Sequence, residues 1–355
     1  MNIKECLSVI TAQLKENNID TPAQEAGVLL CHALKCDRTY LYAHPEEELA
    51  EHVVEQLFDS VIKRINKIPL QYIVGNTEFM SLTFSVTPSV LIPRQDTELL
   101  VETCINLANK GVAGAGPRSP RQISILDMCT GSGCIAVSLA WYLGQARLTA
   151  CDISDEALEV ARVNAKNNGV AERITFLQGD LFDALIGLEQ VIPSSVDMSE
   201  AQAEQTQHMQ EHKAQDEQIE TQHMHVEEAQ AEQIETQHMH VEEAQAQQVQ
   251  QAQSFDIIAS NPPYIESETI STLDPEVRSN EPLLALDGGT DGLDFYRRIS
   301  KESSAYLKQG GYLVLEIGYN QGQTVSSLLT EAGFTNVSVL KDLCNNDRVV
   351  LGQKL

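Results

Sequence analysis

Residues 1–70 carry apolar side chains three or four positions apart, the spacing of a buried helix face. Thr21-Pro22 marks the start of one helix, because proline is tolerated in the first helical turn. The pattern therefore predicts a small helical domain over residues 1–70. Its apolar positions are Ile3, Leu7, Ile10 and Leu14, then Ala26 to Leu34, then Val53, Leu57, Val61 and Ile65.

The period changes in residues 71–95. Phe84 and Val86 alternate with Thr83 and Ser85, as on a strand with one buried face. Prolines punctuate the segment after this alternation, at positions 88 and 93. The segment is predicted to be a hairpin linker between two domains.

Strands and helices alternate over residues 96–355, after an initial helix at 97–108. Apolar runs predict strands at 123–127 and 148–152. Between Ser154 and Gly169 the pattern is helical, with Ser154 as the N-cap and Gly169 as the stop. Such alternation is typical of the α/β class with a doubly wound, mostly parallel sheet.

A low-complexity insertion interrupts this domain at about residues 187–253. Within it, the sequence of residues 217–230 recurs at 232–245, a period of 15 residues. Residues 201–253 hold 11 acidic residues and one basic residue, and so carry 10 of the 27 excess negative charges. We expect a solvated loop here, and another at 111–120, rather than a metal site at the His-x-His pairs.

The composition narrows the class of protein. With 355 residues, of which 42% are hydrophobic, the chain can bury a substantial core, and it has no run of about 20 apolar residues that would span a membrane. The scattered cysteines are expected to be buried free thiols, and the location to be cytoplasmic. The net charge of −27 argues against direct binding of nucleic acid and favours a protein substrate.

The most informative motif is Asn261-Pro262-Pro263-Tyr264, which follows the apolar run 255–260. Proline fixes φ, so a Pro-Pro step presents its carbonyl acceptors rigidly, and the Asn261 side chain adds a further acceptor. Such acceptors can hold both hydrogens of one NH₂ group, while Tyr264 stacks on a flat π-system. The motif predicts methylation of a planar amide or an exocyclic amine.

A second motif, residues 127–136, lies between a predicted strand and a predicted helix. Gly131 and Gly133 allow close approach of a ligand to the backbone. Asp152 follows at the end of the next strand, where an acid can hold the ribose hydroxyls of a nucleoside cofactor. A dinucleotide is the competing ligand, but only Gly131 and Gly133 fit its G-x-G-x-x-G pattern. Asp180 suits an adenine amino group, with Leu181 or Phe182 against the ring, and a helix N-cap is the competing interpretation of Asp180.

Histidine is missing from the α/β domain outside the insertion. Six of the nine histidines lie in the repeat and three in the helical domain, so the sequence excludes a Ser-His-Asp hydrolase there. It shows no metal-ligand cluster either. Alignment of bound reactants is the form of catalysis that these residues favour.

Five segments together resemble the PrmC/HemK family. They are Gly75 to Phe79, Leu91 to Glu98, Asn261 to Tyr264, Glu281 to Gly289 and Asp347 to Gly352. The resemblance covers the chain except for 111–120 and about 187–253. It implies a seven-stranded Rossmann-like class I methyltransferase domain that methylates the glutamine amide in the Gly-Gly-Gln motif of peptide chain release factors.

The resemblance also implies roles for particular residues. Cys129, Thr130, Gly131, Ser132, Gly133, Asp152, Asp180, Leu181 and Asn261 would contact S-adenosylmethionine. Asn261, Pro262, Pro263 and Tyr264 would hold the glutamine, and the helical domain would dock the release factor. A monomer is expected. Cys129, where the family often has glycine, and Gln95, where it often has proline, depart from the pattern.

Three other functions are alternatives to this one. Flipped adenines suit the Asn-Pro-Pro-aromatic loop equally well, as in nucleic-acid adenine methyltransferases. A ribosomal-protein glutamine methyltransferase would differ mainly in the N-terminal domain. An interaction scaffold with a dead cofactor fold would leave both motifs unexplained. Arg94 could orient the domain linker or the substrate backbone, but it is expected to pair with Asp96 or Glu98 in a solvated turn. Glu316 is expected to satisfy neighbouring backbone.

Overall fold

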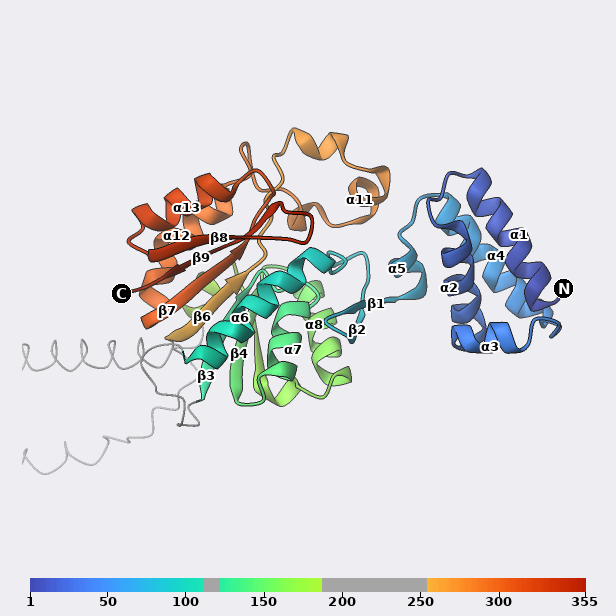
Figure 1. Ribbon diagram of the computed structural model, residues 1–355, viewed down its shortest axis with the longest axis horizontal. Helices are drawn as coiled ribbons and strands as arrows, with labels where there is room; N and C mark the ends of the chain where they lie inside the picture. Colours follow the sequence, from blue (N-terminus) through green and yellow to red (C-terminus); the bar gives the residue numbers. More distant parts are fainter. Residues whose placement is uncertain (112–121, 187–253) are drawn as a thin grey trace, which may run out of the picture. The chain divides into compact units, whose positions relative to one another are not determined.

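The computed structural model describes residues 1–111, 122–186 and 254–355. Within these ranges the chain forms a helical bundle, a two-stranded hairpin and a seven-stranded sheet with helices on both faces (Figure 1). The α/β prediction is confirmed. The predicted insertion at about 187–253 and residues 112–120 of the predicted loop lie outside the described residues. The division at residues 70 and 95 stays a prediction.

The N-terminal bundle begins with a capped helix. The Asn2 side chain accepts from the Glu5 amide while the Glu5 carboxylate accepts from the Asn2 amide, a capping box that pairs two amides of the first turn. Pro22 opens the next long helix, as predicted. The helices are α1 (Ile3–Glu16), α2 (Pro22–Leu34), α3 (Arg38–Ala43), α4 (Glu51–Ile65) and α5 (Leu70–Val74).

The predicted hairpin consists of β1 (Asn76–Phe79) and β2 (Leu82–Ser85). The buried Asn164 side chain of α8 (Asp155–Asn167) exchanges two hydrogen bonds with the Ser85 backbone, at 2.7 and 3.0 Å. The same amide donates to the Ser132 carbonyl at 2.8 Å. One side chain therefore joins the hairpin to the loop that follows the first strand of the sheet.

The large sheet has the strand order β5-β4-β3-β6-β7-β9-β8. Pairing is parallel from β5 through β7, whereas β9 is antiparallel to both of its neighbours. The strands are β3 (Ile123–Met128), β4 (Ala146–Asp152), β5 (Ile174–Gln178), β6 (Phe255–Ser260), β7 (Leu307–Glu316), β8 (Thr335–Lys341) and β9 (Asp347–Gln353). The order reverses between β3 and β6, and a ligand crevice is expected at the carboxyl ends of these strands.

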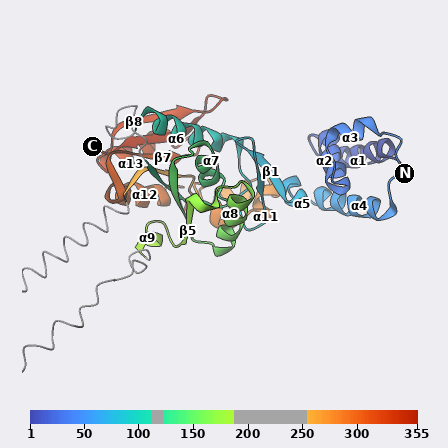
Figure 2. The same cartoon turned by 90° about the horizontal axis from the view of Figure 1, so that it is seen from below.

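Helices cover both faces of the sheet (Figure 2). On one face α6 (Glu98–Lys110), α7 (Cys134–Tyr142) and α8 pack in sequence, and on the other α12 (Asp294–Tyr306) packs against α13 (Gly322–Glu331). Ser154 caps α8 through the Ala157 amide, as predicted. The short elements are α9 (Asp183–Ile186), α11 (Pro275–Asn280), η1 (Gln95–Thr97), η2 (Ala171–Arg173), η4 (Thr269–Thr272) and η5 (Leu283–Ala285).

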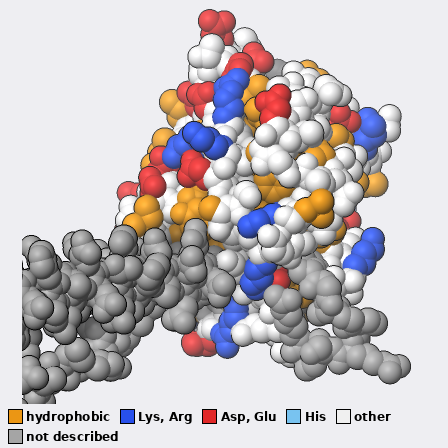
Figure 3. Space-filling model, turned by 90° about the vertical axis from the view of Figure 1, so that its left-hand side faces the viewer, with side chains coloured by type: hydrophobic (Ala, Val, Ile, Leu, Met, Phe, Trp, Pro, Cys, Tyr) orange, Lys and Arg blue, Asp and Glu red, His pale blue; other side chains and the backbone are white. Residues whose placement is uncertain are grey.

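One face of the molecule carries charges of both signs, and the prediction of buried free thiols is met only in part. On the face shown in Figure 3, Lys and Arg side chains are interspersed with Asp and Glu. None of the helices in the described ranges has the length and apolar character needed to cross a membrane. The cysteines are free but not uniformly buried: Cys344 is exposed, because it lies in the turn between β8 and β9.

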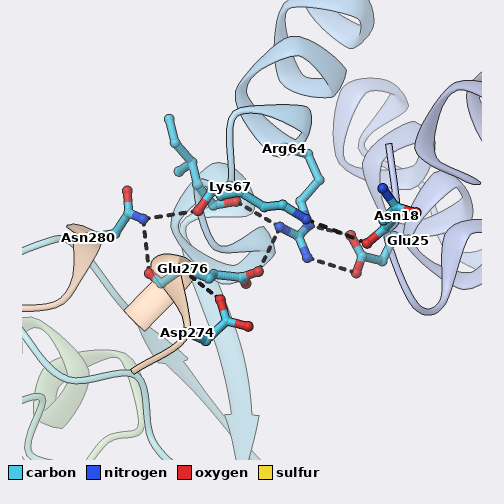
Figure 4. Close-up of polar contacts among 8 residues, drawn as sticks. Asn18, Glu25, Arg64, Lys67, Asp274, Glu276 and Asn280 are labelled. Atoms are coloured by element: carbon cyan, nitrogen blue, oxygen red, sulfur yellow. Dashed lines mark hydrogen bonds and ion pairs between the residues drawn. The ribbon is translucent and has the colours of Figure 1, made fainter. Parts of the chain in front are cut away.

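Arg64 is the centre of a buried ionic cluster (Figure 4). Its guanidinium bonds both carboxylate oxygens of Glu25 on α2, at 2.5 and 3.2 Å, and the Glu276 carboxylate on α11 at 2.9 Å. Asn280 of α11 donates to the Lys67 carbonyl beside it, at 3.0 Å. The Arg64 side chain is only 7% exposed. One cation therefore compensates two carboxylates drawn from segments far apart in the sequence.

Replacing Arg64 by alanine should destabilise the protein strongly, because it leaves the Glu25 and Glu276 carboxylates without their partner. Breaking a buried pair in this way typically costs about 3–5 kcal/mol. Urea unfolding of the purified protein measures the loss. Arg162→Ala is the matched control, since Arg162 pairs with Glu159 at an exposed site where such pairs are worth roughly 0–1 kcal/mol. Equal losses of unfolding free energy in Arg64→Ala and Arg162→Ala would contradict a buried ionic cluster at Arg64.

Candidate active site

A cavity opens at the carboxyl ends of β3 and β6, where the strand order predicts it. Four loops that follow strands contribute to its wall, together with the segment before α6. Among the predicted site residues, those that line it are Cys129, Thr130, Gly131, Ser132, Asp152, Asp180, Leu181, Asn261 and Pro263. Gly133, Pro262 and Tyr264 are not part of its lining. Both predicted motifs therefore meet at one cavity.

The loop after β3 has an unusual backbone. Cys129, Gly131 and Gly133 have φ values of 60°, 53° and 78°, in the left-handed region. A Cβ atom on Gly133 would lie 2.9 Å from the Cβ of Ala161 on α8, whereas one on Gly131 would meet no atom within 4 Å. Gly133 is therefore required by packing as well as by φ. Cys129 adopts the left-handed conformation despite its side chain, which explains why glycine is also compatible there.

Asp127 holds the two ends of this loop together. One of its carboxylate oxygens, Oδ2, accepts from the Thr130 hydroxyl at 2.6 Å and from the Ala136 amide at 3.0 Å. The group is fully buried, and this burial raises its pKa to about 7 against the effect of both hydrogen bonds. No role for Asp127 was predicted from the sequence. Its signal was an acid at the end of an otherwise apolar strand.

Asp152 connects the same loop to β4. Its Oδ2 accepts from the Gly131 amide at 2.8 Å, and its Oδ1 accepts from the Ser154 amide at 3.0 Å. Burial raises the pKa of this carboxyl, and the backbone donors oppose the shift. Each carboxylate oxygen keeps further acceptor capacity. The arrangement can therefore accept hydroxyl donors from a ligand without losing its hold on the loop.

Asp180 makes contacts that the sequence did not predict. Both of its carboxylate oxygens accept hydrogen bonds from Arg298 of α12, at 2.9 and 3.1 Å. Arg298 also lines the cavity. Leu181 is buried in the cavity wall with φ 52°, while Phe182 stacks on Tyr306 at 4.7 Å instead. Of the two apolar candidates, Leu181 is the one that lines the cavity.

The Asn261–Tyr264 loop is held by residues 286–289, a segment with two glycines. The Ile265 amide donates to the Leu286 carbonyl and the Gly288 amide donates to Ile265, forming an isolated parallel bridge. A Cβ atom on Gly288 would lie 2.7 Å from the Cα of Tyr264, so only glycine allows this approach. Burial raises the pKa of Tyr264 to about 12, so its hydroxyl keeps its proton at neutral pH.

The segment before α6 corrects one expectation. Arg94 does not pair with Asp96 or Glu98. Its guanidinium bonds the buried Glu281 carboxylate, while Asp96 pairs with Arg348 and Glu98 accepts from the Met80 amide. The expectation failed because it considered only partners close in sequence. The pairing instead joins two of the five segments that carry the family resemblance.

Two family models match parts of the chain. Residues 5–75 match the model of the PrmC N-terminal domain, and residues 125–191 match a methyltransferase domain. The release factor glutamine methyltransferase of Moorella thermoacetica is 35% identical, over 100% of this chain and 99% of that protein.

The release factor glutamine methyltransferase of Clostridium acetobutylicum is 32% identical, over 99% of this chain and 98% of that protein. Among solved structures, a methyltransferase from Pyrococcus furiosus is 14% identical and has a TM-score of 0.41, covering 86% of this chain and 99% of that one.

The two loop glycines should differ in their tolerance of alanine. Gly131→Ala costs mainly the left-handed conformation, about 1 kcal/mol. Gly133→Ala should cost about 1–3 kcal/mol more, because the added methyl overpacks against Ala161. Denaturant midpoints of the two variants, followed by circular dichroism, provide the measurement. The packing argument fails if Gly133→Ala is no less stable than Gly131→Ala.

Proposed function

Because the chain belongs to the family of release factor glutamine methyltransferases, we propose that it methylates the glutamine side-chain amide in the Gly-Gly-Gln motif of peptide chain release factors. The methyl donor in this proposal is S-adenosylmethionine. The observation that carries the proposal is one cavity lined both by the glycine loop with Asp152 and by Asn261 with Pro263. One half suits a nucleoside cofactor, and the other suits a planar amide.

The residues that line the cavity fit S-adenosylmethionine. Asp152 offers carboxylate acceptors for ribose hydroxyls, and Leu181 supplies an apolar wall for a flat base. The loop from Cys129 to Gly133 allows close approach of the remaining part through its backbone. In this proposal Asp180 accepts from the adenine amino group after it exchanges part of its contact with Arg298.

The substrate amide is a weak nucleophile, because the lone pair of its nitrogen is delocalised. When bound, the cofactor supplies an electrophilic methyl group on a positively charged sulfur. Transfer would form a nitrogen–carbon bond and break the carbon–sulfur bond, with a neutral thioether as the leaving group and one amide proton passing to solvent. The enzyme's contribution is alignment, which can supply about 7–11 kcal/mol of the barrier.

Asn261 and the two prolines provide that alignment in our proposal. The Asn261 oxygen and a rigid proline carbonyl accept the two amide hydrogens of the substrate glutamine. Pro262 and Pro263 are both buried, so this part of the loop is fixed before the substrate arrives. Tyr264 packs the loop from behind through its backbone contact with Gly288. The helical N-terminal region serves as the dock for the release factor.

The cofactor assignment predicts a specific loss in Asp152→Asn. Charge-assisted hydrogen bonds to ribose are worth about 1.5–3 kcal/mol, so S-adenosylmethionine affinity should fall roughly tenfold or more by calorimetry. Asp155→Asn is the control, because Asp155 is exposed in the first turn of α8 and does not line the cavity. Tight binding of NAD with no response to S-adenosylmethionine would refute the assignment.

The acceptor assignment predicts that Asn261→Ala loses at least about a hundredfold in the rate of methyl transfer, since one of two amide contacts disappears. Tyr264→Phe should be milder than Tyr264→Ala if the ring rather than the hydroxyl matters. Mass spectrometry of a full-length release factor incubated with enzyme and cofactor locates the methyl group. The proposed function would be wrong if the enzyme methylated adenine instead, or if it methylated only a glutamine in a ribosomal protein.

A further inference from the structure

We propose that Thr97 and Glu316 are positioning residues that fix the orientation of the Asn261 side-chain amide, with its oxygen toward the substrate. The inference rests on the proposed function, because it concerns how the acceptor amide is held. Neither residue belongs to the predicted site. Thr97 is 2% exposed and lines the cavity, and Glu316 is 1% exposed, so both are buried polar groups.

Strand pairing brings the three residues together. Ser260 at the end of β6 pairs with Leu315 near the end of β7, so Asn261 and Glu316 follow at the same edge of the sheet. Thr97 comes from η1, immediately before α6, and its side chain lines the cavity. The Asn261 Nδ2 atom lies 3.3 Å from the Thr97 Oγ1 atom. The Thr97 side chain in turn faces the Glu316 carboxyl and lowers its pKa, as a hydroxyl that donates to an ionised carboxylate does.

The hydrogen-bonding capacity of threonine determines the direction of this chain. A hydroxyl has one proton to donate, whereas an ionised carboxylate can only accept. Once Thr97 donates to Glu316, its oxygen can interact with Asn261 only as an acceptor. The NH₂ group of Asn261 must then face Thr97, and its carbonyl oxygen must face away from it.

The orientation matters because the substrate is itself a primary amide. Its nitrogen carries two hydrogens and therefore needs acceptors in the enzyme. An Asn261 turned by 180° would present its own NH₂ to the substrate NH₂, and two donors cannot bond each other. The ionised Glu316 therefore acts at a distance, through Thr97, on the group that touches the substrate.

The surroundings of Glu316 allow its carboxyl to be either ionised or neutral near pH 7. Burial raises its pKa to about 7, while Thr97, Arg348 and Arg94 oppose the shift and Asp96 adds to it. Its Oε2 atom has no hydrogen-bond partner in the described residues. Neutral groups also face it: Tyr264 in the loop, Cys134 on α7 and Tyr296 on α12, whose hydroxyl donates to the Glu316 carbonyl at 2.9 Å.

A neutral Glu316 would reverse the chain of hydrogen bonds. Its proton could go to Thr97, which would then be free to donate to the Asn261 oxygen. The acceptor would turn away from the substrate. The structure therefore predicts that kcat rises with pH as Glu316 ionises, with an apparent pKa near that of the carboxyl.

The experiment compares Thr97→Val with Thr103→Val by steady-state methylation of full-length release factor. Valine keeps the shape of threonine and removes the hydroxyl. Thr103 lies on α6, is 7% exposed and donates only to the Leu99 carbonyl, so it controls for loss of a buried hydroxyl. We expect kcat to fall about tenfold to a hundredfold in Thr97→Val and less than about twofold in Thr103→Val. Thr97→Ser should restore most of the rate.

Two further readouts separate positioning from structural support. The affinity for S-adenosylmethionine should be the same in Thr97→Val and Thr103→Val. The pH profile of kcat, measured from about 6 to about 8, should lose its rising limb in Glu316→Gln. Any limb due to Asp127, whose pKa is also about 7, would survive in that variant.

Each outcome decides one claim. Equal kcat in Thr97→Val and Thr103→Val, or a loss confined to cofactor affinity, overturns the inference and leaves the proposed function intact. A rising limb that persists in Glu316→Gln overturns the role of Glu316. If wild-type enzyme leaves the release factor glutamine unmethylated while folded and bound to cofactor, the proposed function fails and the inference fails with it.

Discussion

The parallel pairing of β3 with β6 is the constraint on which the candidate site depends. Met128 and Ser260 are paired residues at the ends of these strands, and the Ser260 hydroxyl donates to the Met128 carbonyl at 2.7 Å. The loops that begin at Cys129 and Asn261 must therefore start side by side, although 132 residues separate their last strand positions. A shift of one residue would move every side chain of β6 to the opposite face of the sheet and separate the two halves of the site.

The site departs from the rules that govern the rest of the core. Elsewhere, buried carboxylates have cationic partners, as Glu25 has in Arg64 and Asp256 has in Lys308. Asp127 and Glu316 are fully buried without a direct ion pair among the described residues, and burial raises the pKa of each to about 7. Perturbed acids of this kind cluster where proteins position charge for function. Their ionisation costs stability that a purely structural core would not give up.

The sequence predicted the elements and the two main motifs because their signals are local. The apolar spacing of α1, the cap at Ser154 and the glycine loop each depend on residues a few positions apart. That Asn261 and Asp152 contact one cofactor was implied by the family resemblance, and parallel strands do place their carboxyl ends at one edge of the sheet.

The failures concern partners distant in sequence. Arg94 pairs with Glu281, and Asp180 with Arg298, across separations of 187 and 118 residues. Local reasoning assigns each charge a neighbour, but burial and sheet order select the actual partner. Thr97 was overlooked for the same reason, since its contact with Asn261 spans 164 residues. Such contacts become visible only once the strand order is known.

The Asn164 amide has a consequence for local opening of the structure. Its hydrogen bonds hold Ser85 of the hairpin and Ser132 of the glycine loop at the same time. Neither segment can separate from α8 without leaving part of this buried amide unsatisfied, which is costly. The hairpin and the glycine loop should therefore detach together, as one cooperative unit in amide hydrogen exchange. Ligand occupancy at the loop would then slow exchange in a hairpin that the ligand never touches.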